Sequence, residues 1–271
     1  MGFHEALSDR TLPRSRQVFI TVPPYRGMTF VPVLGWLAGR VGTPDAEVNW
    51  QVDKQQGPRS IARLLTSIGW RLARRRSGRK TLLTGPLPSH RQRPNPRRFD
   101  AKLDGVELRL EADYGVFSPE RLDAGTQLLF DVAKTSGSAE TLCDVGTGYG
   151  PLAIGLVATG IAARAVATEV DSIAVWLARR NARAHGVDLS VVWSPDPLAV
   201  PSTPLTVCNV PTHINADQTH RLIAGLAARG GRLLIVVHAS LGDRYSRLVA
   251  QTGRRVRGHQ GDSHVVLDAD Y

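Results

Sequence analysis

Three alternating glycines follow an apolar stretch in the middle of the chain. The stretch ends at Asp144, glycines stand at 146, 148 and 150, and residues 151–157 are typical of the opening of a helix. Glycine tolerates positive φ and has no Cβ, so backbone N–H groups in such a turn can lie close to a ligand. The spacing Asp-x-Gly-x-Gly-x-Gly differs from the dinucleotide motif Gly-x-Gly-x-x-Gly. We expect Asp144, Gly146 and Gly148 to contact a bound cofactor.

Three more polar residues stand where expected strands end. Glu169 comes about 20 residues after the turn, a spacing that suits a carboxylate accepting two ribose hydroxyls; the alternative is a helix-start carboxylate near a helix dipole. Asp196 could accept an adenine amino group or form a turn between its flanking prolines. Asn209 ends another apolar stretch and is also expected to contact the cofactor. Ligands of open α/β sheets bind beyond the carboxyl ends of the strands, so we expect one shared site.

The turn resembles motif I of the Rossmann-like methyltransferases, which bind S-adenosylmethionine. Residues 114–129 are similar to the segment that precedes motif I in the small-domain rRNA guanine-N2 methyltransferases. Asn209-Val-Pro-Thr-His213 stands where those enzymes carry Asn-Pro-Pro-Phe-His, and residues 55–60 resemble their N-terminal turn before a helix. The resemblance covers residues 99–271 firmly and 17–84 loosely.

The resemblance implies roles for the residues that match. The side-chain oxygen of Asn209 would accept a hydrogen bond from the target amino group, with the Val210 carbonyl as a second acceptor. Pro211 and His213 would complete the catalytic motif, the histidine in an unassigned role. The wall of the cofactor site would be formed by Phe117, Thr126 and Gln127.

Two departures from the family pattern put the target base in doubt. Val210 replaces a proline that stiffens the turn, and Thr212 replaces the aromatic residue on which the flipped base stacks. Loss of that platform removes about 1–3 kcal/mol of stacking. Either Phe117, Tyr114 or Trp193 stacks the base, or the acceptor is another atom, such as an adenine nitrogen. A degenerate site without catalysis is a further alternative.

The positive charge lies almost entirely in the first part of the chain. The net charge is +10, of which residues 1–100 carry +12 and residues 101–271 carry −2. A basic front half before a nearly neutral half indicates that the first holds a polyanion and the second performs chemistry. A GC-rich genome would explain arginine in place of lysine, but not the asymmetry. We expect the polyanion to be RNA.

The expected RNA-binding residues lie around a helix over residues 58–76. Ile61, Leu65 and Ile68 share its apolar stripe, and Trp70 falls among arginines on the opposite side. Trp70 could stack on RNA or pack against the neighbouring domain. The candidates are Arg59, Arg63, Trp70, Arg74, Arg75, Arg76, Arg79 and Lys80.

The pattern predicts two α/β domains. Residues 1–84 form a basic N-terminal domain, residues 85–98 a Pro/Arg-rich linker, and residues 99–271 a catalytic domain. Strand–helix alternation in the last part predicts a Rossmann-like, mostly parallel sheet with an antiparallel C-terminal hairpin. Its strands are expected near 106–110, 139–145, 163–169, 189–193, 205–209, 231–238, 254–259 and 263–268. The front half repeats the strand–helix order and could be a degenerate copy.

The remaining composition narrows the class of protein. No apolar run approaches the roughly 18 residues of a membrane span, no export leader is evident, and no metal-ligand spacing occurs. Cys143 and Cys208 fall in expected strands, which favours buried thiols. We therefore expect a cytoplasmic, metal-free, monomeric or weakly dimeric methyltransferase that uses S-adenosylmethionine on a base nitrogen of structured RNA, most simply rRNA. The alternatives are a small-molecule methyltransferase and an RNA-binding module that senses the cofactor.

Overall fold

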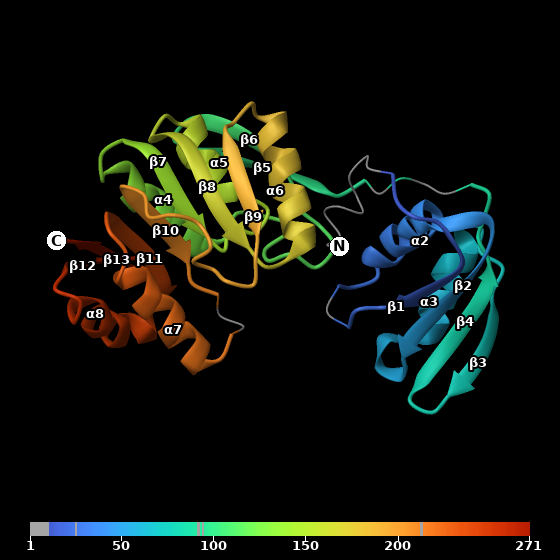
Figure 1. Cartoon of the computed structure of the whole chain (residues 1–271). Helices are drawn as coiled ribbons and strands as arrows, with labels where there is room; N and C mark the ends of the chain where they lie inside the picture. The colour runs from blue at the N-terminus through green and yellow to red at the C-terminus, as the bar shows by residue number, and fades with distance from the viewer. Residues whose placement is uncertain (1–10, 25, 91–92, 94, 212–213) are drawn as a thin grey trace. The chain divides into compact units, whose positions relative to one another are not determined.

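The chain folds into two compact units, described here from a computed structural model (Figure 1). Unit 1 comprises the chain up to Arg97 together with Asp113–Val116, and unit 2 comprises Arg98–Ala112 and Phe117–Tyr271. The segment expected as a linker is partly built into unit 1, because Leu87 is buried and its N–H donates to the Ala46 carbonyl. The residues that the structure describes are 11–24, 26–90, 93, 95–211 and 214–271.

Unit 1 is a four-stranded sheet with two helices. The sheet order is β1-β2-β4-β3, in which β1 and β2 are parallel and the other neighbours are antiparallel. Alternation along β2 buries Val48, Trp50 and Val52, the face on which the core is built. The elements are β1 (Ser15–Thr21), α2 (Phe30–Val41), β2 (Gly42–Asp53), a 3₁₀ helix (Lys54–Gln56), α3 (Pro58–Ser67), β3 (Ala73–Ser77) and β4 (Lys80–Pro86).

Unit 2 is built on a seven-stranded sheet. The elements are β5 (Arg98–Leu103), β6 (Val106–Glu111), α4 (Ala124–Lys134), β7 (Ala139–Val145), α5 (Pro151–Ala158), β8 (Ala162–Glu169), α6 (Ser172–Ala184), β9 (Leu189–Trp193), β10 (Leu205–Asn209), α7 (Ala216–Ala227), β11 (Arg232–His238), a 3₁₀ helix (Ala239–Leu241), α8 (Gly242–Ala250), β12 (Arg255–Gln260) and β13 (His264–Asp270). The sheet order is β12-β13-β11-β10-β7-β8-β9. Among the described strands of this sheet only β13 runs in the opposite direction, pairing antiparallel with β11 and β12, which confirms the expected sheet with an antiparallel hairpin at its edge.

The two faces of this sheet carry different helices. The apolar residues of α7 and α8 pack on the face that includes Cys143 and Cys208, and both thiols are buried and free. The opposite face carries α6, which packs on Ala167 and Val191 (Figure 1). Within the part of the chain that the structure describes, no helix has the length and apolar character to cross a membrane.

Unit 1 repeats the last part of the unit 2 fold. The chain order β1-α2-β2-α3-β3-β4 matches β10-α7-β11-α8-β12-β13, and the two sheet orders correspond strand for strand. In both, a parallel pair is followed by an antiparallel hairpin whose second strand joins the sheet. Each second strand also leads through a 3₁₀ helix and a glycine into a helix. The front unit is therefore a partial copy of the second unit's fold.

The helix expected over residues 58–76 ends at Ser67. Gly69 has a φ of +97° and donates its N–H to the Thr66 carbonyl, while the Trp70 N–H donates to the Leu65 carbonyl. This pair of bonds is a Schellman motif, in which glycine in the left-handed region ends the helix and a buried residue follows. Consequently the arginine run 74–76 lies on strand β3, and the prediction of a helix there is wrong.

Trp70 is a core residue. Its side chain is 2% exposed and makes an edge-on contact with Trp50 at 5.1 Å between ring centroids. The Trp70 ring also lies close to the backbone of α2, since a Cβ on Gly35 would lie 3.3 Å from the ring. The expectation that Trp70 stacks on RNA is therefore wrong, and its packing lies within unit 1.

The strand expected at 106–110 pairs outside the main sheet. It is β6, which forms a two-stranded antiparallel sheet with β5. The turn between them is Asp104-Gly105, with both residues at positive φ, the conformation of a tight hairpin. This Asp-Gly pair was the local indication of a hairpin that strand–helix alternation alone does not reveal.

The packing of Trp70 predicts a large loss of stability on truncation. Trp70→Ala should lower the free energy of unfolding by about 3–5 kcal/mol, because it leaves a cavity beside Trp50 and α2. Phe19, which is 78% exposed, is the matched aromatic control, and Phe19→Ala should cost about 0.5 kcal/mol or less. Urea unfolding followed by circular dichroism measures both. Similar losses for the two variants would contradict the placement of Trp70.

Candidate active site

The glycine turn joins β7 to α5 at the carboxyl edge of the sheet. The N–H groups of Gly146 and Thr147 donate to the Thr168 carbonyl at 2.9 and 3.1 Å, which holds the turn against the end of β8. Gly146 and Gly148 have φ of +73° and +60°, and a Cβ on either would project into open space. The backbone of the turn therefore faces a space that a ligand can enter closely.

Gly150 has a different role from the other two glycines. Its φ is +90°, and a Cβ there would lie 2.9 Å from Ile154 Cδ1 and 3.4 Å from Ala178 Cβ. It precedes Pro151, the first residue of α5. Gly150 therefore permits close packing of α5 and α6 behind the turn.

Asp144 lies behind the turn and supports it. Its side chain is 2% exposed, and Oδ2 accepts a hydrogen bond of 2.7 Å from the Thr147 hydroxyl. Burial raises the pKa of the carboxyl to about 7, although the Thr147 hydroxyl and a backbone bond from Ala153 lower it. The nearby Glu169 carboxylate raises it further. Asp144 thus fixes the shape of the turn from within the protein.

Glu169 joins the turn to the end of β8. Its Oε2 accepts a 2.8 Å hydrogen bond from the Gly148 N–H, and its Oε1 accepts one of 2.8 Å from the Asp171 N–H. Burial raises the pKa of this carboxyl, which is 9% exposed. Each carboxylate oxygen can accept more than one hydrogen bond, so an oriented Glu169 can still receive hydroxyl donors from a ligand.

Two loops adjoin the edge at which these residues meet. The Tyr149 hydroxyl donates to the Ser118 carbonyl at 3.1 Å, which places the neighbouring Phe117, 57% exposed, near the turn. The Thr168 hydroxyl donates to the Pro197 carbonyl at 2.8 Å, which holds the loop containing Asp196 beside β8. Asp196 is exposed, and its Oδ1 accepts from the Leu198 N–H. Asp196 therefore forms a turn, as its alternative interpretation expected, through Oδ1. Its Oδ2 takes no part in that hydrogen bond.

Asn209 is oriented by a hydrogen-bond network. Its Nδ2 donates to Asp123 Oδ2 at 3.0 Å and to Thr126 Oγ1 at 2.9 Å. Asp123 also caps α4, because the same oxygen accepts from the Thr126 N–H at 3.1 Å. A carboxylate only accepts hydrogen bonds, so the amide nitrogen of Asn209 must face Asp123. Both amide protons are thus engaged, and the Asn209 oxygen is directed elsewhere as an acceptor.

Val210 anchors the turn that follows Asn209. Its N–H donates to the Val236 carbonyl at 3.1 Å, and its side chain is 6% exposed. A proline at this position could not make that bond, because it has no N–H. The substitution of valine for the family's proline therefore exchanges ring stiffness for a hydrogen bond to β11. Pro211 follows, half-buried, whereas Thr212 and His213 lie outside the described residues.

Two histidines lie beside this network. His238 ends β11 and His264 begins β13, and their rings make an edge-on contact at 6.0 Å between centroids. A Cβ on Gly125 would lie 3.2 Å from His264 Cδ2 and 3.0 Å from Asp123 Oδ2. His264 and Asp123 were not among the sequence candidates. Asp123 was recognisable as a helix N-cap, because an aspartate three residues before the N–H of Thr126 is the usual capping arrangement.

Other candidates are placed away from these contacts. The Gln127 amide donates to Asp131 Oδ1 at 3.2 Å, along its own helix. Tyr114 is 3% exposed and packs against Phe30, so the alternative that it stacks a base is wrong. Trp193 ends β9, is 42% exposed and donates its indole N–H to the Val170 carbonyl. Phe117 and Trp193 are therefore the exposed aromatic candidates from the sequence.

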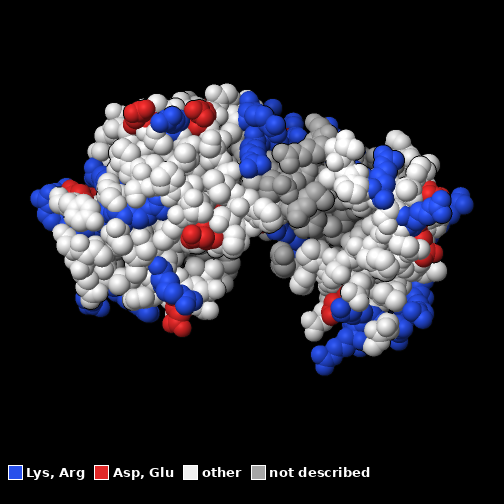
Figure 2. Space-filling view, viewed as in Figure 1, with Lys and Arg blue, Asp and Glu red and all other residues white. Residues whose placement is uncertain are grey.

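The cationic candidates lie on unit 1 (Figure 2). Arg59 and Arg63 are on α3, Arg74, Arg75 and Arg76 are on β3, and Arg79 and Lys80 are at the turn before β4. All of them are exposed. These exposed side chains form a cationic surface on unit 1. It is made by a helix, a strand and a hairpin turn instead of the one continuous helix that was expected.

Comparison with known proteins identifies a family model and several relatives. The family model described as "Methyltransferase small domain" matches residues 107–263. A ribosomal RNA small subunit methyltransferase C of Chromohalobacter salexigens is 30% identical over 212 residues, covering 74% of this chain and 62% of that protein. A ribosomal protein L11 methyltransferase of Geobacter metallireducens is 33% identical over 132 residues, covering 48% and 42%. The chain thus spans less than two thirds of the length of these relatives.

A solved structure extends the similarity in fold to both units. The 16S rRNA methyltransferase of T. thermophilus, solved in complex with AdoMet and guanosine, has a TM-score of 0.75 and 21% sequence identity. The match covers 95% of this chain and 73% of that one. At this identity the likeness establishes a common fold, the Rossmann-like methyltransferase sheet preceded by a smaller α/β unit.

The buried carboxyl of Asp144 predicts a pH-dependent stability. Because its pKa rises from 3.8 to about 7 on folding, its contribution to the free energy of unfolding is greatest below about pH 4. That contribution falls by at most about 1.4 kcal/mol per pH unit until about pH 7, and is flat above. The Asp144→Asn variant does not titrate at this position. Its free energy of unfolding should therefore increase relative to that of the native chain as the pH rises from 4 to 7. Urea unfolding at pH 5, 6, 7 and 8 tests this, and parallel profiles would contradict it.

Proposed function

This chain belongs to the methyltransferase small domain family, and on that premise we propose that it transfers a methyl group from S-adenosylmethionine to a base nitrogen of ribosomal RNA. The observation that carries the proposal is the meeting of the glycine turn, Glu169 and an oriented Asn209 at one edge of the sheet. A cytoplasmic location and a monomeric or weakly dimeric state remain predictions from the sequence.

The residues at the turn fit a nucleoside cofactor. Gly146 and Gly148 face open space, and Glu169 is held by two backbone N–H groups with acceptor capacity left. In our proposal Glu169 accepts the ribose hydroxyls, the turn lies against the amino-acid end, and Asp196 and Phe117 adjoin the base. Bound S-adenosylmethionine supplies an electrophilic sulfonium methyl, so the protein needs chiefly to orient the acceptor and exclude water.

Asn209 has the geometry of an acceptor-orienting group. Its amide protons are engaged by Asp123 and Thr126, so its oxygen can accept a hydrogen bond from one N–H of the target amine. In our proposal the Val210 carbonyl accepts a hydrogen bond from the other N–H, which directs the nitrogen lone pair towards the methyl group. Asp123 is then a positioning residue, because it acts through the Asn209 amide without touching substrate.

The cationic front unit supports an RNA substrate. Residues 1–100 carry a net charge of +12, and two of the relatives are named for methylation of ribosomal RNA. A small-molecule methyltransferase would have no use for this charge, and no observation favours that alternative. The ribosomal protein L11 methyltransferase matches 48% of the chain, whereas the ribosomal RNA methyltransferase matches 74%, so the longer match favours RNA over protein as the substrate.

Partition of transferred label tests the proposed function. We expect the chain, incubated with methyl-labelled S-adenosylmethionine and undermethylated small ribosomal subunits, to place label in the RNA fraction after phenol extraction. Parallel reactions with ribosomal proteins and with a metabolite extract serve as controls. Label in protein or in small molecules, with none in RNA, would refute the RNA substrate.

Substitutions at the two halves of the site should separate binding from transfer. Asn209→Ala should lower kcat by about 100-fold or more, since an amine held by one acceptor is poorly aligned, while the Kd for S-adenosylmethionine changes little. Glu169→Ala should instead raise that Kd by about tenfold or more, the value of a lost charge-assisted bond. Calorimetry and single-turnover methylation measure the two quantities. Equal loss of cofactor binding in both variants would defeat this division of roles.

The positioning role of Asp123 has its own test. Asp123→Asn presents an amide whose orientation is no longer fixed as an acceptor, so we expect a fall in kcat of about tenfold with KM for RNA nearly unchanged. Asp131→Asn, on the same helix, is the matched control. A change confined to thermal stability, with kcat intact, would assign Asp123 a capping role alone.

A further inference from the structure

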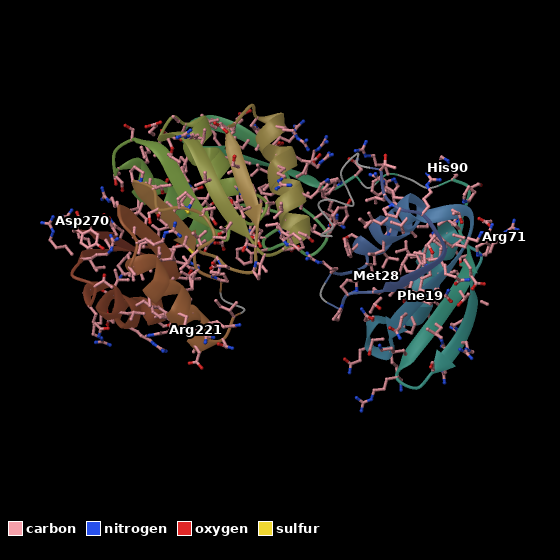
Figure 3. The ribbon with its side chains drawn as sticks, viewed as in Figure 1. Phe19, Met28, Arg71, His90, Arg221 and Asp270 are labelled. Atoms are coloured by element: carbon pink, nitrogen blue, oxygen red, sulfur yellow. The ribbon has the colours of Figure 1, made fainter. Side chains whose placement is uncertain are left out.

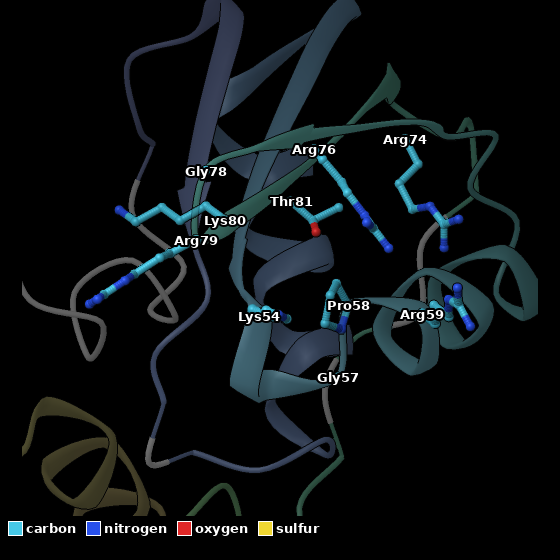
Figure 4. Close-up of a pocket in the computed structure, with 10 residues that line it drawn as sticks. All are labelled: Lys54, Gly57, Pro58, Arg59, Arg74, Arg76, Gly78, Arg79, Lys80 and Thr81. Carbon is cyan, nitrogen blue, oxygen red and sulfur yellow. The ribbon is translucent and has the colours of Figure 1, made fainter.

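Unit 1 contains an open pocket of about 310 Å³ between the start of α3 and the β3–β4 hairpin (Figure 4). Its lining combines backbone at Gly57, Pro58 and Gly78 with cationic side chains and Thr81. Among the described residues that line it, none is acidic or aromatic. The cationic residues that line it are Lys54, Arg59, Arg74, Arg76, Arg79 and Lys80.

The charge of this pocket is not neutralised within the described part of the protein. None of its six cationic side chains forms an ion pair with another described residue, and all are exposed. Arg74 and Arg76 extend from β3 towards Pro58 and Arg59, whereas Arg79 and Lys80 extend past the hairpin turn, away from Arg59 (Figure 4). The arginines at its centre repel one another unless an anion lies between them.

The backbone at the start of α3 adds to the positive electrostatic potential of the pocket. Pro58 is the first residue of α3, and Gly57, the N-cap, has no side chain to bond the first N–H groups. The Ser60 and Ile61 N–H groups both donate to the Gly57 carbonyl, and the Arg59 N–H precedes these bonds. The Arg59 N–H and the helix dipole at this end favour an anion.

The pocket occupies the ligand-binding edge of the copied fold. Lys54 directly follows β2, just as Ala239 directly follows β11 in unit 2. Strand register also corresponds, since Asp53 pairs with Lys80 as His238 pairs with His264. Parallel strands of α/β sheets present their ligand sites at this edge. Unit 1 thus retains the edge of a binding site and lines it with cations.

We propose that this pocket binds consecutive phosphates of the RNA backbone and so fixes the substrate on unit 1. The inference rests on the proposed RNA substrate. Arg59 and Arg76 would hold one phosphate at the start of α3, and Arg79 and Lys80 would follow the strand beyond it. Without aromatic lining the pocket cannot stack a base, so it positions RNA without reading sequence. Charge that continues along the hairpin suits a polymer better than a single phosphate.

A charge-matched pair of double variants tests this assignment. Arg59→Ser with Arg76→Ser removes two pocket cations, and Arg71→Ser with Arg75→Ser removes two exposed cations outside it. Arg75 adjoins Arg76 on the opposite face of β3, and Arg71 lies at the surface of unit 1 (Figure 3). The probe is a labelled small-subunit rRNA transcript, titrated by filter binding at several salt concentrations.

The two variants should differ in affinity and in salt dependence. We expect the pocket variant to bind at least about tenfold more weakly than the control variant. The slope of log K against log salt should fall by about 1.4–1.8 in magnitude, the contribution of two phosphate contacts. Equal losses in the two variants would show that only net charge matters, which overturns the proposal.

A measurement on the native chain needs no substitution. The four lysines are Lys54, Lys80, Lys102 and Lys134, and Lys102 in unit 2 is an exposed reference. Bound transcript should slow acetylation of Lys54 by about threefold or more relative to Lys102, because a phosphate covers the amine. An unchanged Lys54 rate would overturn the pocket assignment.

The outcomes also separate this inference from the proposed function. Pocket-dependent binding without methyl transfer to RNA would refute the function and leave the pocket standing. Methyl transfer to RNA with equal binding losses in both double variants would refute the pocket and leave the function standing.

Discussion

The constraint on which the site depends is that buried carboxylates must be hydrogen-bonded. Parallel strands β7 and β8 end at one edge of the sheet, and each ends near an acid that is almost fully removed from water. An unpaired carboxylate there would cost several kcal/mol. Backbone N–H groups of the glycine turn and the Thr147 hydroxyl meet this need. The same bonds that make burial tolerable therefore fix the turn in its open shape.

The second half of the site follows the same rule through a helix. Asp123 caps α4 and, with the same oxygen, orients the Asn209 amide. The start of α4 and the end of β10 are far apart in sequence, so this pairing arises only when helix and sheet pack. The valine at position 210, where the family pattern has proline, is compatible with this geometry. Its N–H donates to the Val236 carbonyl of β11, and this hydrogen bond stiffens the turn in place of the proline ring.

The two units show how one topology can serve different chemistry. Both lead a second parallel strand through a 3₁₀ helix and a glycine into a helix, and both close with an antiparallel hairpin. In unit 2 this edge carries histidines beside the Asn209 network, whereas in unit 1 it carries arginines and lysines. In our proposals, the first edge holds the reacting base and the second holds the phosphates of the same RNA.

Sequence patterns were sufficient to predict the sheet of unit 2 and the strand ends at which Asp144, Glu169 and Asn209 stand. The alternation of apolar residues in strands and their helical periodicity are local patterns, and glycine spacing reflects local requirements on φ. Both can therefore be recognised from the sequence. The orientation of Asn209 by Asp123, and the match between unit 1 and the later strands of unit 2, emerged only in the folded chain, because both depend on pairing between distant segments. Trp70 and the arginines that follow it illustrate the same limit. Gly69 terminates the helix, and the Trp70 ring packs against Trp50 and α2 in the core. The periodicity of a single segment does not encode such a contact.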